Sequence, residues 1–215
     1  MSEDRGALMA AEIAEQPEAL ARLLAPASLP QVREIAGTIR DRSPRFVLLA
    51  ARGTSDHAAL YAKYLVEVSL GLPAGLASPS TMTAYGARPD LSDVLLLTVS
   101  QSGGSPDLIE TVRTARAGGA TTLAVTNNPD SALAAAAELQ FDVLAGPEHA
   151  VAATKSYSSQ LLALWLLIDA FRGGDSAAAR AVQRDLQCIG HPARVSLLPV
   201  RQGRGDGQDR QRPAE

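Results

Sequence analysis

The chain has 215 residues, a formal net charge of −3, one cysteine and few aromatic residues. This length allows one substantial core or two small ones. The small net charge argues against nucleic-acid binding through bulk charge, and a lone cysteine, Cys188, excludes an internal disulfide framework and fits a reducing cytoplasm. The first 25 residues lack the pattern of a secretion signal, and the apolar run over 161–168 is too short to span a bilayer. We therefore expect a cytoplasmic protein with no membrane contact.

Helical patterns dominate the first 42 residues. Apolar residues recur at helical spacing over 7–24, where Pro17 kinks or divides the helix. A second helix is predicted from Ser28 to about Arg40, with Pro30 in its first turn. A break over 41–44 follows, so we expect residues 1–42 to form an N-terminal helical segment.

Short apolar runs then alternate with helical patterns over residues 43–175. The apolar runs predict strands at 46–50, 73–77, 94–99, 121–126 and 139–144. The helical patterns cover 54–70, 78–86, 106–117, 131–137 and 154–172. This alternation predicts an α/β fold: an open, mostly parallel five-stranded sheet with helices on both faces. It would be a three-layer sandwich of the Rossmann or flavodoxin type with right-handed crossovers.

Two of the predicted strands end in turns rich in small and hydroxyl residues. The strand over 94–99 runs into Ser100-Gln-Ser-Gly-Gly-Ser105, and the strand over 46–50 runs into Arg52-Gly-Thr-Ser55. The carboxyl ends of parallel strands meet at one edge of a sheet, where α/β folds bind ligands. Hydroxyl groups beside helix N-termini suit a phosphate. An ordinary turn whose serines only cap the next helix would show the same pattern.

Several motifs in order resemble the sugar isomerase (SIS) domain family over residues 9–175. They are Met9-Ala-Ala-Glu-Ile-Ala-Glu-Gln-Pro17, Arg52-Gly-Thr-Ser55, Ser100-Gln-Ser-Gly103 and Ala153-Thr-Lys155. Within the family, the chain is most similar to the isomerase part of glutamine–fructose-6-phosphate aminotransferases and to the glucosamine-6-phosphate deaminases with tandem SIS domains. The resemblance implies binding of a hexose phosphate, either fructose 6-phosphate or glucosamine 6-phosphate.

The same resemblance implies the residues of the site. The phosphate ligands would be Ser55, Ser100, Gln101, Ser102 and Ser105. The residues lining the sugar would be Gly53, Thr54, Val151, Ala153, Thr154 and Lys155. One departure is Gly104, which stands where the family often has glutamate and leaves the preferred sugar open. No cofactor or metal is expected, since the chain has neither a clustered Cys/His ligand set nor a dinucleotide fingerprint.

The catalytic groups are not evident. Aldose–ketose isomerisation needs a base and an acid that opens the sugar ring. The family's amino-sugar enzymes take these groups from a second SIS domain and a C-terminal lysine, for which this chain has no matching positions. Glu148 and His149 are local candidates, because they follow a strand in a loop.

Other polar and aromatic residues have structural interpretations. We interpret His57 as a residue of a helix cap and Glu67 as an exposed or salt-bridged side chain. Lys155 would either pair with phosphate or solvate the start of its helix. Trp165 is expected in the core or in a dimer interface.

Apolar periodicity is lost after about Leu186, and we expect residues 176–215 to be an atypical, disordered tail. A frameshift that truncated a longer tandem protein would give the same composition.

Three functions stay open: a substrate-binding domain that is active only with a partner lobe, a non-catalytic sugar-phosphate sensor, and a truncated remnant. We also expect a homodimer, because the helix over 154–172 carries more apolar residues than one sheet face needs.

Overall fold

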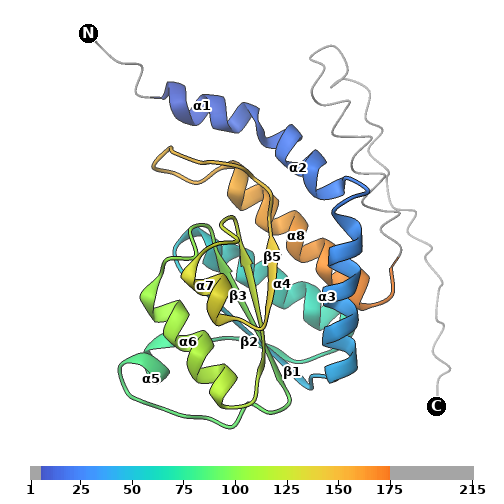
Figure 1. The fold of residues 1–215 in the computed structure, drawn as a ribbon, viewed down its shortest axis with the longest axis vertical. Helices are drawn as coiled ribbons and strands as arrows, with labels where there is room; N and C mark the ends of the chain where they lie inside the picture. Colours follow the sequence, from blue (N-terminus) through green and yellow to red (C-terminus); the bar gives the residue numbers. More distant parts are fainter. Residues whose placement is uncertain (1–5, 175–215) are drawn as a thin grey trace, which may run out of the picture.

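The centre of the molecule is a sheet of five parallel strands in the computed structural model, which describes residues 6–174 (Figure 1). The strands are β1 (Phe46–Ala51), β2 (Ala74–Leu76), β3 (Val94–Ser100), β4 (Thr121–Thr126) and β5 (Leu139–Asp142). They lie in the order β2-β1-β3-β4-β5, and every neighbouring pair is parallel. The predicted open α/β sheet is thus confirmed.

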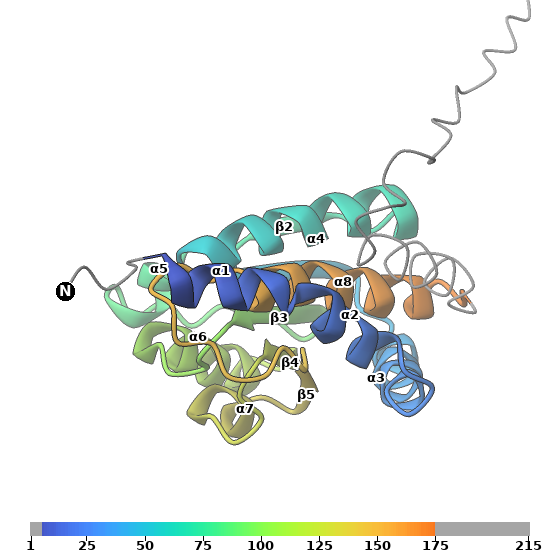
Figure 2. The ribbon, with the colours of Figure 1, turned by 90° about the horizontal axis from the view of Figure 1, so that it is seen from above.

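Helices cover both faces of the sheet, as Figure 2 shows from above. One face carries α3 (Leu29–Arg42), α4 (Thr54–Leu70) and α8 (Lys155–Phe171), with α2 (Gln16–Leu24) packed on α8. The other face carries α6 (Pro106–Ala117) and α7 (Ala132–Ala136), with α5 (Pro79–Thr83) packed on α6. The three layers expected from the sequence are therefore present.

The central strand β3 shows why the sheet needs both layers. Leu95, Leu97 and Val99 belong to the core beneath α4 and α8, whereas Leu96 belongs to the core beneath α6 and α7. Successive side chains of a strand point to opposite faces, so an unbroken apolar run fits only a strand that is covered on both sides. The buried Thr98 hydroxyl donates to the Leu123 carbonyl at 3.1 Å, which satisfies the one polar side chain in the middle of the strand.

The apolar surface of α8 is used inside the chain. This helix contacts α2, α3, α4 and β4, and Trp165 packs partly buried against the same core. The N-terminal helices therefore account for the apolar excess that the sequence analysis assigned to a dimer interface. Exposed apolar residues recur at a spacing of four on α4, at Leu60, Tyr64 and Val68.

The N-terminal segment is divided as the proline indicated. Helix α1 (Ala7–Ala14) ends before α2 begins, with Pro17 in the first turn of α2. Figure 1 shows α1 beside the loop that links β5 to α8. Within residues 6–174, no helix is long and apolar enough to cross a membrane. The expected tail over 176–215, including the proposed frameshift, lies outside the described residues.

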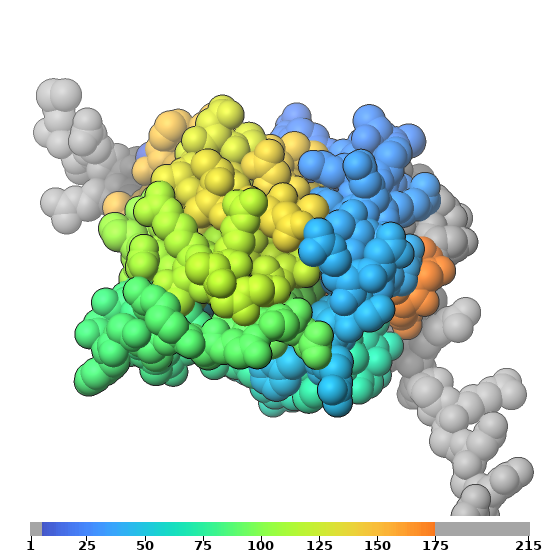
Figure 3. All heavy atoms as spheres, turned by 60° about the horizontal axis from the view of Figure 1, so that its bottom comes forward, coloured from blue at the N-terminus to red at the C-terminus, as the bar shows by residue number. Residues whose placement is uncertain are grey.

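The amino ends of the strands lie at the edge of the sheet away from the turns that follow β1 and β3. Figure 3 shows the molecular surface with the bottom of Figure 1 turned forward. A hollow of about 480 Å³ opens there, bordered by the chain before β3 and by the end of α6. Its lining includes Arg88, Asp90 and Ser92. The sequence-predicted residues lie elsewhere, on turns and loops that follow the strands.

Candidate functional site

Two turns meet where β1 and β3 end side by side. The strands are paired in register up to Ala51 and Val99, so the chain leaves both strands at the same edge. The strand order also reverses here, because β2 lies on one side of β1 and β3 lies on the other. Such a switch point is where open α/β sheets bind ligands. The turns lead directly into α4 and α6, whose N-termini carry partial positive charge.

The turn after β3 is held by its own hydroxyls and by β4. The Gly103 amide donates to Ser100 Oγ at 3.1 Å, and the Gly104 amide donates to Ser102 Oγ at 3.3 Å. The Gln101 carbonyl accepts from the Asn127 amide at 3.2 Å. Ser100 is buried and Ser102 is exposed. One hydroxyl thus shapes the turn while the other is accessible to a ligand.

Ser105 stands at the N-cap position of α6 with Pro106 after it, and the helix covers the predicted range 106–117. Its hydroxyl donates to Asp107 Oδ1 at 2.7 Å instead of accepting a helix amide. The other Asp107 oxygen lies 3.0 Å from Arg52 Nη1. This ion pair joins the two turns and sets a guanidinium beside the candidate anion site. An exposed pair of this kind adds little stability.

In the turn after β1, Gly53 occupies the N-cap position of α4, and the helix makes no side-chain cap bond. Gly53 has φ +61°, a conformation that favours glycine, and this lets the chain turn directly into the helix. Ser55 is therefore buried in the first helical turn, while Thr54 is exposed.

The loop after β5 carries the residues expected to line the sugar. Val151 is fully exposed, and Ala153 and Thr154 are partly buried. Lys155 is different, because only 2% of it is exposed and its Nζ lies 2.5 Å from Glu15 Oε2. Its ammonium therefore does not solvate the start of α8. The partner Glu15 was missed because it lies between α1 and α2, far away in the sequence.

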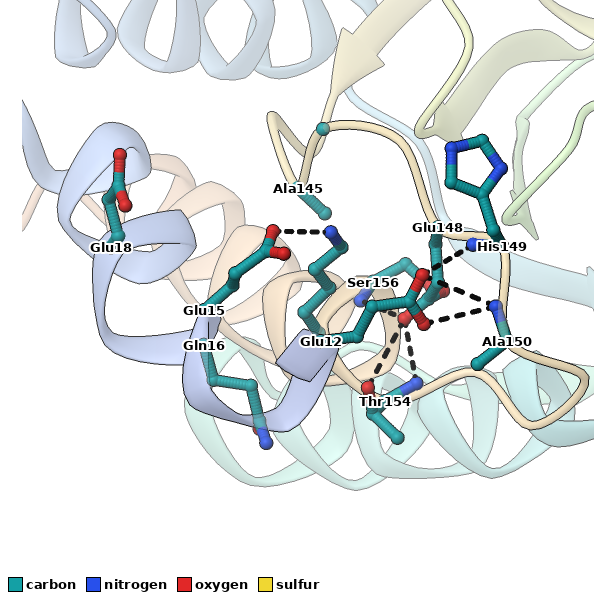
Figure 4. A network of polar contacts seen from close by, with 12 residues as sticks. Glu12, Glu15, Gln16, Glu18, Ala145, Glu148, His149, Ala150, Thr154 and Ser156 are labelled. Carbon is teal, nitrogen blue, oxygen red and sulfur yellow. Dashed lines mark hydrogen bonds and ion pairs between the residues drawn. The ribbon is translucent and has the colours of Figure 1, made fainter. Parts of the chain in front are cut away.

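The Glu148 carboxylate serves as the cap of α8 (Figure 4). It accepts from the Thr154 amide at 2.8 Å, from the Ser156 amide at 3.3 Å and from Ser156 Oγ. Burial alone would raise the pKa of this carboxyl, but the hydrogen bonds from Ser156 and the loop amides outweigh it and lower its pKa. Glu148 is thus an ionised acceptor at neutral pH.

The other residues considered in the sequence lie at the surface or in a salt bridge. His149 and His57 are exposed. Glu67 accepts from Lys63 at 2.7 Å, which confirms the expected salt bridge. In the part of the chain that the structure describes, no group of three or more His, Cys, Asp or Glu side chains could hold a metal ion.

Replacing Gly103 by alanine is expected to destabilise the fold by about 2 kcal/mol or more, since it adds both strain and a clash. Gly103 has φ +63°, and an added Cβ would overlap Ser131. Gly104→Ala is the matched control, because its nearest neighbour, Ser102 Oγ, would lie at 3.7 Å. The control should range from no change to a gain of about 1 kcal/mol. Urea unfolding of both variants checks this, and equal midpoints would contradict the turn geometry.

Glu148→Gln should cost about 1–2 kcal/mol at pH 7, a typical loss for a helix cap. The lowered pKa means that the carboxylate stabilises the folded chain above the unfolded pKa, near 4.3. That stabilisation is lost as the pH falls through the lower folded value. Urea unfolding from pH 7 into the acid range should show the wild type and the variant converging. A constant difference at all pH values would refute the ionised cap, and Glu34→Gln, at an exposed position of α3, serves as the control.

Known proteins share this arrangement. The SIS domain family matches residues 42–170. A glutamine–fructose-6-phosphate aminotransferase (isomerizing) from Symbiobacterium thermophilum is 41% identical over 169 residues, which cover 74% of this chain and 27% of that protein. The chain thus spans about a quarter to a third of the length of the curated relatives it matches.

Solved structures agree. A protein described as a phosphosugar isomerase from Silicibacter pomeroyi is 39% identical with a TM-score of 0.78, and the match covers 85% of this chain and 55% of that one. The C-terminal domain of a glucosamine-fructose-6-phosphate aminotransferase from Francisella tularensis is 25% identical with a TM-score of 0.66, covering 85% and 53%. The family match spans more than half of the chain and contains both strand-end turns. The chain therefore belongs to the SIS domain family.

Proposed function

We propose that this chain is the hexose-phosphate-binding domain of an amino-sugar isomerase, aminotransferase or deaminase. The observation that carries the proposal is the pair of hydroxyl-bearing turns on β1 and β3, side by side at the switch point of the sheet. The names of the relatives, which include fructose-6-phosphate aminotransferases and a phosphosugar isomerase, support this class of ligand. We further propose residues 43–175 as the SIS domain and 1–42 as its helical segment, in a cytoplasmic protein.

The proposed phosphate ligands lie around the N-termini of α4 and α6. They are Ser55, Ser100, Gln101, Ser102 and Ser105. Hydroxyl and amide donors beside two helix N-termini favour a dianion, and the Arg52 guanidinium adds a positive charge at the same place. The sugar would lie toward Gly53, Thr54 and the loop residues Val151, Ala153, Thr154 and Lys155.

Catalysis by the described residues is a weaker proposal than binding. Glu148 is engaged in the cap of α8 and His149 is exposed, so neither side chain shows the paired acid and base that isomerisation needs. We therefore propose that turnover depends on groups outside the described part of the chain. A non-catalytic sugar-phosphate sensor and an inactive remnant are the alternatives. Turnover of fructose 6-phosphate would distinguish the proposed enzyme domain from both of them.

Ser102→Ala should weaken binding of fructose 6-phosphate about tenfold or more, because a hydrogen bond to a charged group contributes about 1.5–3 kcal/mol. Isothermal titration calorimetry of wild type and variant measures the change. Ser92→Ala, an exposed serine before β3 at the opposite edge, is the control and should leave the affinity unchanged. If the wild type binds neither fructose 6-phosphate nor inorganic phosphate, the proposed function is wrong.

We also propose that the chain forms a homodimer through the exposed face of α4. Leu60, Tyr64 and Val68 form an apolar stripe along this helix, with exposed fractions of 40%, 61% and 82%. The match covers 55% of the phosphosugar isomerase from Silicibacter pomeroyi, which leaves nearly half of the length of that protein unmatched. A second copy of this chain could supply an equivalent mass against the stripe.

Sedimentation velocity at micromolar concentration should therefore show a dimer. Tyr64→Glu should raise the dissociation constant of the dimer at least about tenfold, because it sets a charge in an apolar contact. Tyr85→Glu is the control, since Tyr85 is 85% exposed and lies after α5, away from the stripe. A monomeric wild type would disprove the homodimer.

A further inference from the structure

Helix α1 is attached to the molecule in an unusual way. Its apolar side chains Leu8, Met9 and Ile13 are 51%, 40% and 45% exposed, while its one buried residue is Glu12, which is 2% exposed. An amphipathic helix normally buries its apolar stripe. A buried carboxylate is costly unless it is hydrogen-bonded. The partners of Glu12 therefore show what this helix does.

Glu12 binds the backbone of the loop between β5 and α8. Its Oε1 accepts from the His149 amide at 2.5 Å and from the Ala150 amide at 3.2 Å, and its Oε2 accepts from the Ala150 amide at 3.1 Å (Figure 4). These two amides immediately precede Val151, the first of the loop residues proposed to line the sugar. The carboxylate thus satisfies loop donors that would otherwise need water.

The residues at the junction of α1 and α2 hold the far end of the loop. Glu15 lies between the two helices, and its Oε2 is 2.5 Å from Lys155 Nζ. Gln16, the first residue of α2, accepts at Oε1 from Ser158 Oγ at 2.5 Å. Glu12, Glu15 and Gln16 therefore all bind the loop or the first turn of α8.

Helix α2 holds the near end of the loop. Arg22 donates from Nε to the Leu144 carbonyl at 2.8 Å and from Nη2 to the Ala145 carbonyl at 2.9 Å. Leu144 has φ +53°, a left-handed conformation that is strained for leucine. Such a conformation persists only where the surroundings impose it. Asn127, the residue after β4, also holds this end of the loop, because its side chain accepts from the Ala145 amide at 2.9 Å and donates to the Gly146 carbonyl at 2.8 Å.

We propose that α1 and α2 act as a clamp that sets the conformation of the sugar-lining loop, with Glu12, Glu15 and Arg22 as positioning residues. The proposal rests on the proposed function of this loop. The turn after β3 has largely different anchors, since the Gln101 and Gly103 carbonyls accept from the amides of Asn127, at the end of β4, and Leu133, in α7. Of these two residues, Asn127 also binds the loop. The clamp should therefore act on recognition of the sugar and leave phosphate binding unchanged.

The test is Glu12→Gln, which keeps the shape of the side chain and removes its charge. Hydrogen exchange of the His149 and Ala150 amides should accelerate at least about tenfold, corresponding to the loss of one charge-assisted hydrogen bond. Calorimetry should show fructose 6-phosphate binding weakened about tenfold as well, with inorganic phosphate affinity within about twofold of the wild type. The urea midpoint should stay close to the wild-type value. Glu34→Gln, on the exposed side of α3, should change none of these quantities.

The outcomes of this test bear on the clamp and on the proposed function in different ways. Unchanged amide exchange and unchanged sugar-phosphate affinity in Glu12→Gln would overturn the clamp. Equal losses of fructose 6-phosphate and inorganic phosphate affinity would also overturn it, because they indicate a general structural role. If the wild type binds neither ligand, the proposed function fails, and the exchange measurement still tests the clamp. Should Glu12→Gln not fold, Glu15→Gln replaces it, since Glu15 is half exposed, and the same pattern is expected.

Discussion

The parallel, in-register pairing of β1 with β3 is the constraint on which the candidate site depends. It brings the ends of two strands that are more than forty residues apart in the sequence to one edge. A short turn then leads from each strand into a helix, so two helix N-termini lie at that edge. This pairing sets Ser55 at the same edge of the sheet as the Ser100–Ser105 turn. The burial of β3 on both faces fixes this pairing, because a shift by one residue would exchange the side chains that face the two cores.

The turn after β3 shows how tightly that edge is built. Gly103 lies against Ser131, the residue that caps α7, and the Ser131 hydroxyl accepts from the Ala134 amide at 3.2 Å. A side chain at Gly103 would displace this cap as well as strain the turn. The exposed Ser102 hydroxyl is therefore presented by a backbone that β4 and α7 hold in place. Such a preformed arrangement limits the ordering cost of binding an anion.

Local patterns were sufficient to predict the fold but not the contacts around the loop. The five strands, the division at Pro17 and the helix over 106–117 depend on neighbours in sequence, and all are confirmed. Lys155 pairs with Glu15, 140 residues away, and no local pattern predicts such a contact. The apolar excess of α8 was misread for the same reason, because its covering helices come from the first 42 residues. The signal was present in Glu12, Glu15 and Gln16, three polar residues close together at the end of α1 and the start of α2.

The two halves of the proposed site are thus supported by different parts of the chain. The turn after β3 is anchored by the end of β4 and by α7, which belong to the sheet and the layer beneath it. The loop proposed to line the sugar is anchored by hydrogen bonds and an ion pair from α1, α2 and the residue between them, which lie outside the strand–helix alternation. Because the two sets of anchors differ apart from Asn127, we expect the loop to change its conformation with little effect on that turn. This separation would let one phosphate-binding edge serve different sugars, with the N-terminal helices determining the shape that the sugar meets.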